Sequence, residues 1–191
     1  MYIANRMEAY RTPLDPRDAE TLSVAGADAV GRMLEVRNGA EPTPLVALPG
    51  LAAELGLGAL HVKDEGQRLG LGSFKALGGA YALMQLVREE AEARLGRPVS
   101  PAELTSDEVR RVAEGLTFAC ATDGNHGRSV AQGAQEIGAR AVIFVHAGVS
   151  EARAQAIASF GARIVRVDGS YDDSVREASR VAEAEGWTVL S

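Results

Sequence analysis

The strongest constraint on the fold of this chain is an alternation of short apolar runs with helical segments in its C-terminal half. Residues 116–121, 141–145, 164–167 and 187–190 form the apolar runs, which are typical of buried strands. Between them, apolar residues recur at helical spacing, so that each intervening helix has one apolar side. These positions are Val130, Ala131, Ala134 and Ile137 in one segment and Val175, Ala178, Val181 and Ala182 in another.

Residues that favour helix starts and ends occur between the apolar runs, as the alternation of strands and helices requires. Ser150 and Ser170 are suitable helix N-caps, and Gly138, Gly161 and Gly186 follow the helical segments. Strand, helix and strand repeat at intervals of roughly twenty residues, which is the pattern of βαβ units with parallel strands. The sequence therefore predicts an α/β protein with an open parallel sheet and helices on both faces.

The N-terminal half is less regular. We expect a helix over residues 27–37, an extended segment at residues 42–44, where two prolines disfavour helical geometry, and then a short helix leading to a strand at residues 60–62. A glycine-rich loop follows at residues 66–72. Next comes a long helix that Ser73 can cap. Its apolar face comprises Phe74, Leu77, Tyr81, Met84 and Val87.

A further charged helix is expected before residue 115. Two capping boxes compete for its start, one running from Ser100 to Glu103 and the other from Thr105 to Glu108.

Composition excludes several classes of partner. Acidic residues outnumber basic ones by 26 to 20, and no basic cluster suits nucleic acid or an anionic membrane. No segment has the apolar length of a signal peptide or a membrane span. A single cysteine, Cys120, fits a reducing compartment, so we expect a cytoplasmic protein.

The first candidate site is the glycine loop that ends in Ser73-Phe74-Lys75. It lacks the Gly-Lys-Ser/Thr of a P-loop and the third glycine of a dinucleotide fingerprint. Lys75 lies in the first turn of a helix, where the helix dipole disfavours its charge and favours the neutral amine that attacks an aldehyde. Taken alone, the motif is weak evidence, because most lysines are exposed on the surface.

The second candidate site is the loop from Thr122 to Gly127, between a predicted strand and a predicted helix. In parallel sheets, ligands bind beyond the carboxyl ends of strands, and the backbone N–H groups at a helix start hold anions. Asn125 can form hydrogen bonds, and Asp123 can act as a general base. The alternative is a tight turn with no ligand. His126 has no partner at ligand spacing, which argues against a metal site.

Together these pieces resemble the fold type II family of pyridoxal-phosphate enzymes, of the tryptophan-synthase-β type. Four features occur in the family's order: Pro42-Thr43-Pro44-Leu45, Val62-Lys63-Asp64-Glu65, Ser73-Phe74-Lys75 and Gly124-Asn125-His126-Gly127. The resemblance implies pyridoxal 5'-phosphate as the cofactor. It implies that Lys75 forms the Schiff base, beside Phe74, and that Asn125 bonds the phenolic oxygen of the cofactor.

Within this family the chain most resembles the diaminopropionate ammonia-lyases, through residues 74–79 and 121–128. Threonine dehydratases typically carry Ser or Ala at the position of Asp123. A carboxylate there suits a substrate whose β-substituent is an amine. The resemblance thus implies β-elimination of ammonia from 2,3-diaminopropionate to give pyruvate and ammonia, with Lys75 and Asp123 as catalytic residues and with Thr122 and Gly124 at the substrate carboxylate.

Family members normally continue for about as long again, which supplies a phosphate-binding loop and a partner for the pyridine nitrogen. We therefore expect a fragment, in which residues 1–79 begin a larger, incomplete domain and residues 80–191 form the smaller α/β domain. Full-length members are often homodimers. Two alternatives stay open: a threonine or serine dehydratase-like lyase, and a non-catalytic remnant or interaction domain.

Overall fold

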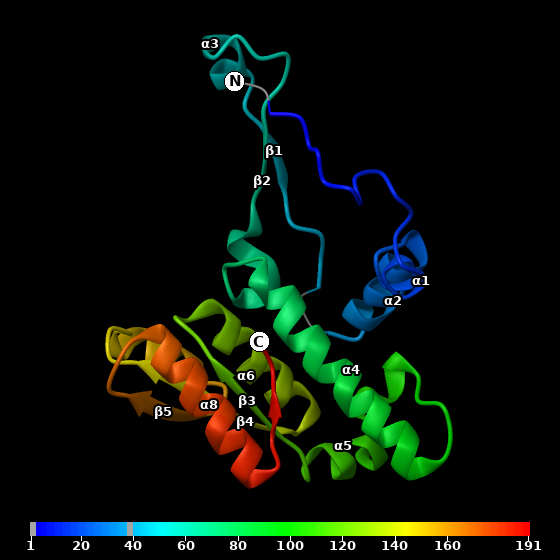
Figure 1. Cartoon of the computed structure of the whole chain (residues 1–191), viewed down its shortest axis with the longest axis vertical. Helices are drawn as coiled ribbons and strands as arrows, with labels where there is room; N and C mark the ends of the chain where they lie inside the picture. The colour runs from blue at the N-terminus through cyan, green and yellow to red at the C-terminus, as the bar shows by residue number, and fades with distance from the viewer. Residues whose placement is uncertain (1–2, 38–39) are drawn as a thin grey trace.

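The computed structural model describes residues 3–37 and 40–191. Its C-terminal half contains a four-stranded parallel sheet with the order β5-β4-β3-β6. The strands are β3 (Thr117–Ala121), β4 (Arg140–His146), β5 (Arg163–Val167) and β6 (Thr188–Val189), shown in Figure 1. Each apolar run of the sequence is therefore a strand, and the predicted α/β class with an open parallel sheet is confirmed.

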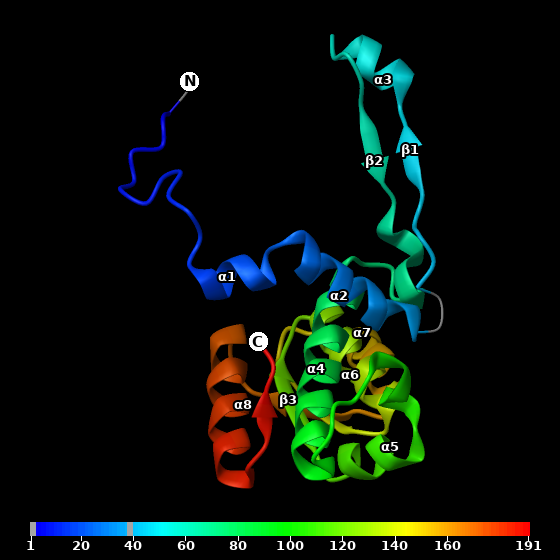
Figure 2. The ribbon, with the colours of Figure 1, turned by 90° about the vertical axis from the view of Figure 1, so that its right-hand side faces the viewer.

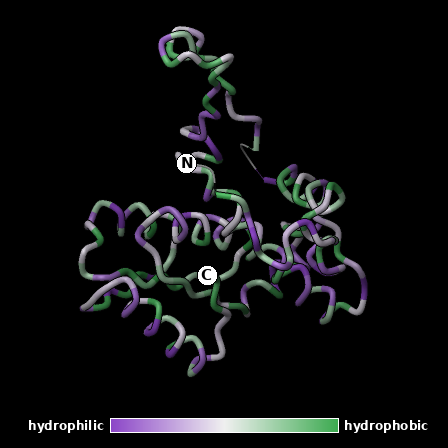
Figure 3. Tube along the Cα trace, turned by 45° about the horizontal axis from the view of Figure 1, so that its top comes forward, coloured by the Kyte–Doolittle hydropathy of each residue, from purple (hydrophilic) through white to green (hydrophobic). Residues whose placement is uncertain are grey.

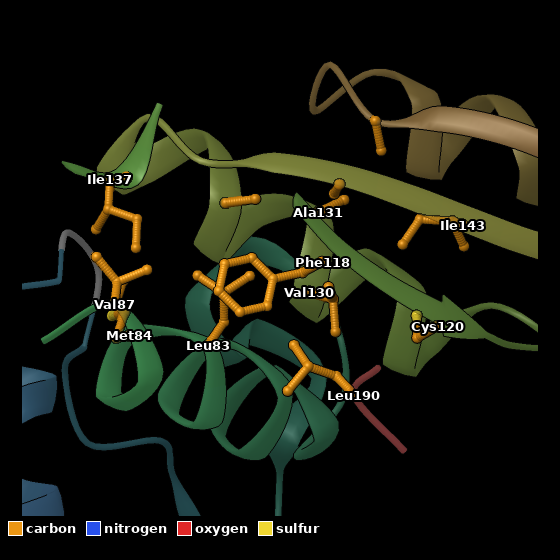
Figure 4. Close-up of a cluster of buried hydrophobic side chains, with 14 of the residues drawn as sticks. Leu83, Met84, Val87, Phe118, Cys120, Val130, Ala131, Ile137, Ile143 and Leu190 are labelled. Atoms are coloured by element: carbon orange, nitrogen blue, oxygen red, sulfur yellow. The ribbon is translucent and has the colours of Figure 1, made fainter. Parts of the chain in front are cut away.

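Three helices connect these strands: α6 (Asn125–Ile137), α7 (Glu151–Ala158) and α8 (Tyr171–Glu185). Helix α8 covers one face of the sheet, where Ala178 and Ala182 pack against Ala119, Val142 and Phe144. Helices α6 and α7 lie on the other face, so helices cover both faces, as predicted. The larger core on that face is drawn in Figure 4 and includes Leu83, Phe118, Val130, Ile137 and Ile143.

Helix α4 (Lys75–Leu95) packs on α6 as an outer layer. Small residues allow the two backbones to approach closely, because a Cβ atom on Gly133 would lie 2.8 Å from Cβ of Ala80. Of the predicted apolar face, Met84 and Val87 are buried, and Leu77 and Tyr81 are half-buried. Leu83 is also buried and was not predicted. The prediction was wrong for Phe74, which precedes the first residue of α4 and is 64% exposed.

The two capping boxes predicted before residue 115 lie at the starts of two successive elements, and only the first of them forms. The capping box of Ser100 and Glu103 starts a 3-10 helix, η2 (Pro101–Thr105). The second helix, α5 (Asp107–Ala113), is capped by Ser106, whose hydroxyl accepts from the Val109 N–H group, and not by Thr105. The competition predicted from the sequence is resolved because the two helices are consecutive.

The N-terminal part lies outside this α/β body (Figures 1 and 2). Helices α1 (Pro16–Thr21) and α2 (Val24–Glu35) come first, and α2 begins three residues before the predicted helix because Ser23 caps it. An antiparallel hairpin of β1 (Leu45–Ala47) and β2 (His61–Lys63) then carries α3 (Pro49–Glu54) and projects from the body. Apolar residues recur along this arm in Figure 3, and the exposed ones include Leu45, Leu55 and Leu57.

The 3-10 helix η1 (Glu65–Gly70) leads from the hairpin to α4. The boundary that we expect between a larger and a smaller domain, after residue 79, falls within the continuous helix α4. No helix in the described part of the chain has the length and apolarity needed to cross a membrane.

Candidate active site

The strand order places a topological switch point at β3. From β3 the chain moves outward through β4 to β5, and α8 then returns it to β6 on the opposite side of β3. In open α/β sheets, ligands bind beyond the carboxyl ends of the strands at such a point. The loop of residues 122–124, between β3 and α6, lies there.

A cavity of about 1140 Å³ occupies this position. All six site residues predicted from the sequence line it: Phe74, Lys75, Thr122, Asp123, Gly124 and Asn125. Two motifs that are separated by about fifty residues in the sequence therefore meet in one place. The volume is sufficient for a cofactor together with a small substrate.

Thr122 shapes the loop after β3. Its buried hydroxyl oxygen accepts hydrogen bonds from the backbone N–H groups of Gly124 (3.0 Å) and Gly127 (3.1 Å). Gly124 has φ 151° and ψ −74°, a backbone conformation that residues other than glycine rarely adopt. Because the Thr122 oxygen already accepts two bonds, its contribution to a bound carboxylate is limited to its O–H donor.

Helix α6 begins at the wall of the cavity. Asn125 is its first residue, and the ring of His126 lies 3.3 Å (Nε2 to O) from the carbonyl of Leu190, after β6. Backbone N–H groups in the first turn of a helix lack intrahelical partners and attract anions. The N–H group of Gly127 already donates to Thr122, so those of Asn125 and His126 are the ones that can bind an anion beside the side chains of Asp123 and Lys75.

Lys75 is the first residue of α4 and is exposed. Hydrogen bonds from two other segments hold the first turn of α4 in place. The carbonyl of Ala76 accepts from Ser129 Oγ of α6 (3.1 Å) and from Arg37 Nη1 (3.0 Å). The side chain of Arg37 is only 1% exposed, and its Nε is 2.8 Å from an oxygen of Glu136. This support for Lys75 was missed by the sequence analysis, because an arginine at the end of a predicted helix gives no local signal of burial.

Asp123 has a partner that the sequence analysis also missed. Its Oδ1 lies 2.8 Å from Nε2 of His146, the last residue of β4. A signal was present, because His146 directly follows the apolar run at residues 141–145 and so had to lie at the carboxyl edge of the sheet. Arg153 and Tyr171, which lie in the first turns of α7 and α8, also line the cavity and were not predicted.

Glu65 and Arg68 of η1 form a salt bridge within this segment. Arg68 Nε is 2.7 Å from Glu65. Hydrogen bonds from Arg68 and then Thr43 lower the pKa of Glu65 to about 2. Among the described residues that line the cavity, neither Glu65 nor Arg68 appears, so a direct role at the cavity has no support.

Comparison with known proteins agrees with this geometry. The sequence model of the family described as "Pyridoxal-phosphate dependent enzyme" matches residues 36–191. The diaminopropionate ammonia-lyase of Salmonella typhimurium is 41% identical over 148 residues, which cover 78% of this chain and 36% of that enzyme. The Escherichia coli K12 enzyme of the same name is 42% identical over 153 residues, which cover 80% and 37%.

Weaker and structural similarities point the same way. A probable D-serine dehydratase of Acidovorax is 30% identical over 74% of this chain. The crystal structure of Escherichia coli diaminopropionate ammonia lyase in complex with D-serine superposes with a TM-score of 0.81 at 37% identity, and the match covers 94% of this chain and 44% of that one. The chain thus spans less than half the length of the relatives it matches.

Proposed function

The chain belongs to the pyridoxal-phosphate dependent enzyme family, and we propose that its cavity serves the β-elimination of ammonia from 2,3-diaminopropionate, which yields pyruvate and ammonia. The observation that carries the proposal is that Lys75 and Asp123, from separate motifs, line the same cavity at the switch point of the sheet. The similarity to diaminopropionate ammonia-lyases supports the choice of substrate.

The residues of the cavity fit the cofactor that the family uses. Lys75, an exposed residue with a primary amine, lines a cavity of sufficient volume. Asn125, the first residue of α6, lines the same cavity and carries a side-chain amide. Lys75 would attach the cofactor, Phe74 would lie beside it, and Asn125 would bond its phenolic oxygen. When bound, the cofactor supplies an electron sink that makes the α-proton of an amino acid acidic.

The remaining roles belong to the loop after β3. The Thr122 hydroxyl and the start of α6 would hold the carboxylate of the amino acid, and Gly124, whose N–H group donates to Thr122, would shape the loop beside it. Asp123 would take the α-proton of one stereoisomer, and Lys75 that of the other. The same Asp123 carboxylate suits a β-amino group better than a β-hydroxyl, since it can hold an ammonium and return a proton to the leaving amine.

The cofactor assignment is tested by trapping. The chain contains two lysines, Lys63 and Lys75, so the protein mixed with pyridoxal phosphate and reduced with borohydride has two candidate side chains to label. We expect peptide mass spectrometry to find the label on Lys75. The label should vanish in Lys75→Arg and persist in Lys63→Arg, the matched control. A label on Lys63, or on neither lysine, contradicts the assignment and favours a non-catalytic domain.

The substrate assignment is tested by ammonia release from 2,3-diaminopropionate, threonine and serine. We expect diaminopropionate to be preferred, and we expect Asp123→Ser to lower its kcat/KM by about 10²-fold or more, the range for loss of a general base. A preference for threonine or serine that survives Asp123→Ser would instead support a dehydratase, the function that the similarity to the probable D-serine dehydratase favours.

A further inference from the structure

His146 is placed against Asp123 by the register of the sheet. Strands β3 and β4 are parallel neighbours, and Ala121 pairs with Phe144. Asp123 comes two residues after Ala121, and His146 comes two residues after Phe144. The same register therefore places Asp123 and His146 side by side. Their side chains meet at 2.8 Å, and among the described residues His146 is the one side chain that hydrogen-bonds the Asp123 carboxylate.

The backbone after β4 determines which ring nitrogen of His146 faces Asp123 as a donor. The N–H group of Gly148 donates to His146 Nδ1 at 3.1 Å. A backbone N–H can only donate, so Nδ1 carries no proton and the proton of the neutral ring lies on Nε2. Nε2–H then donates to Asp123 Oδ1. In this arrangement the histidine is a fixed hydrogen-bond donor.

Gly148 is also required for the position of the ring. A Cβ atom at residue 148 would lie 2.8 Å from His146 Cε1 and 3.1 Å from Nδ1. Any larger residue would push the imidazole away from its present place. The turn after β4 is therefore shaped to present one orientation of the histidine.

We propose that His146 is a positioning residue for Asp123. It occupies Oδ1 and thereby orients the carboxylate in the cavity, with Oδ2 left to exchange protons with the substrate. The inference rests on the proposed function for the role of Asp123. Asp123 itself is 66% exposed and belongs to a loop, so without this bond its side chain would sample several rotamers.

Three variants separate the possible effects of His146. His146→Phe removes the donor and keeps a ring, His146→Gln keeps an N–H donor, and Gly148→Ala displaces the ring without removing any polar group. We expect His146→Phe to lower kcat for diaminopropionate by about 10- to 100-fold with little change in KM, because misplacement of a catalytic group acts on the chemical step. His146→Gln should recover most of the rate, and Gly148→Ala should resemble His146→Phe.

A measurement without the cofactor tests the contact itself. Nitrogen-15 NMR of the imidazole groups should show His146 as the Nε2–H tautomer, with a pyridine-type Nδ1. The chain has three histidines, and His146→Gln assigns the signal. The tautomer preference should weaken in Gly148→Ala. A ring protonated on Nδ1 would overturn the proposal.

A double-mutant cycle distinguishes failure of this inference from failure of the proposed function. In an Asp123→Asn background, His146→Phe should cost no further activity, because its effect passes through Asp123. An equal loss in both backgrounds would overturn the positioning role. If Asp123→Asn alone leaves ammonia release unchanged, the proposed role of Asp123 fails, and the positioning inference fails with it, although the NMR contact remains measurable.

Discussion

Among single residues, Gly127 in the first turn of α6 must lack a side chain for the helix to pack against Thr122 at the candidate site. A Cβ atom there would lie 2.5 Å from Thr122 Cγ2 and 2.9 Å from Ile143 Cγ2, which belong to two buried side chains. We expect Gly127→Ala to lower the free energy of unfolding by about 1–3 kcal/mol through overpacking, despite the better helix propensity of alanine. Gly31→Ala in α2 is the matched control, because nothing lies within 4 Å of its Cβ position. Urea denaturation measures both, and equal stabilities would contradict the prediction.

Among the secondary-structure elements, helix α8 begins with the capping box that returns the chain toward β6. Hydrogen bonds from Ser170 and then Arg176 lower the pKa of Asp173 from 3.8 to about 2. Since the folded pKa lies below the unfolded one, this stabilisation is present above about pH 4 and is lost as pH falls toward 2. We expect Ser170→Ala to raise the Asp173 pKa toward 3.8, as measured by NMR titration, and to weaken the acid dependence of unfolding. Ser179→Ala, inside α8, should leave the Asp173 titration unchanged.

At the scale of the whole molecule, stability is distributed unevenly between the α/β body and the hairpin arm. Residues of β1 and β2 are exposed, whereas the middles of β3 and β4 are buried. The free energy of the local opening that exposes a backbone amide to exchange ranges from near zero up to the free energy of global unfolding. We expect hydrogen exchange in β1 and β2 to be at least about 10²-fold faster than in β3 and β4, after correction for intrinsic rates. Uniform protection across the chain would show that the arm is stabilised as strongly as the body.

Much of the fold was predictable because its signals are local. The strands β3 to β6 and the buried side of α6 follow from apolar runs and helical spacing, which depend on neighbours in the sequence. The start of α2 was misplaced by three residues and the cap of α5 by one, since several serines and threonines nearby can cap a helix and packing selects among them. The exposure of Phe74 was also missed, because helical spacing does not say where the contact with α6 begins.

The candidate site divides in the same way. The sequence by itself determined the α/β class, the two motifs that carry Lys75 and Asp123, and the family resemblance, because residue types and their order are local properties. Only the tertiary structure decided that these motifs share one cavity, that Arg37 and Ser129 anchor the first turn of α4, and that His146 meets Asp123. The physical reason is that strand order and register bring together residues distant in the chain, and these depend on how whole faces pack.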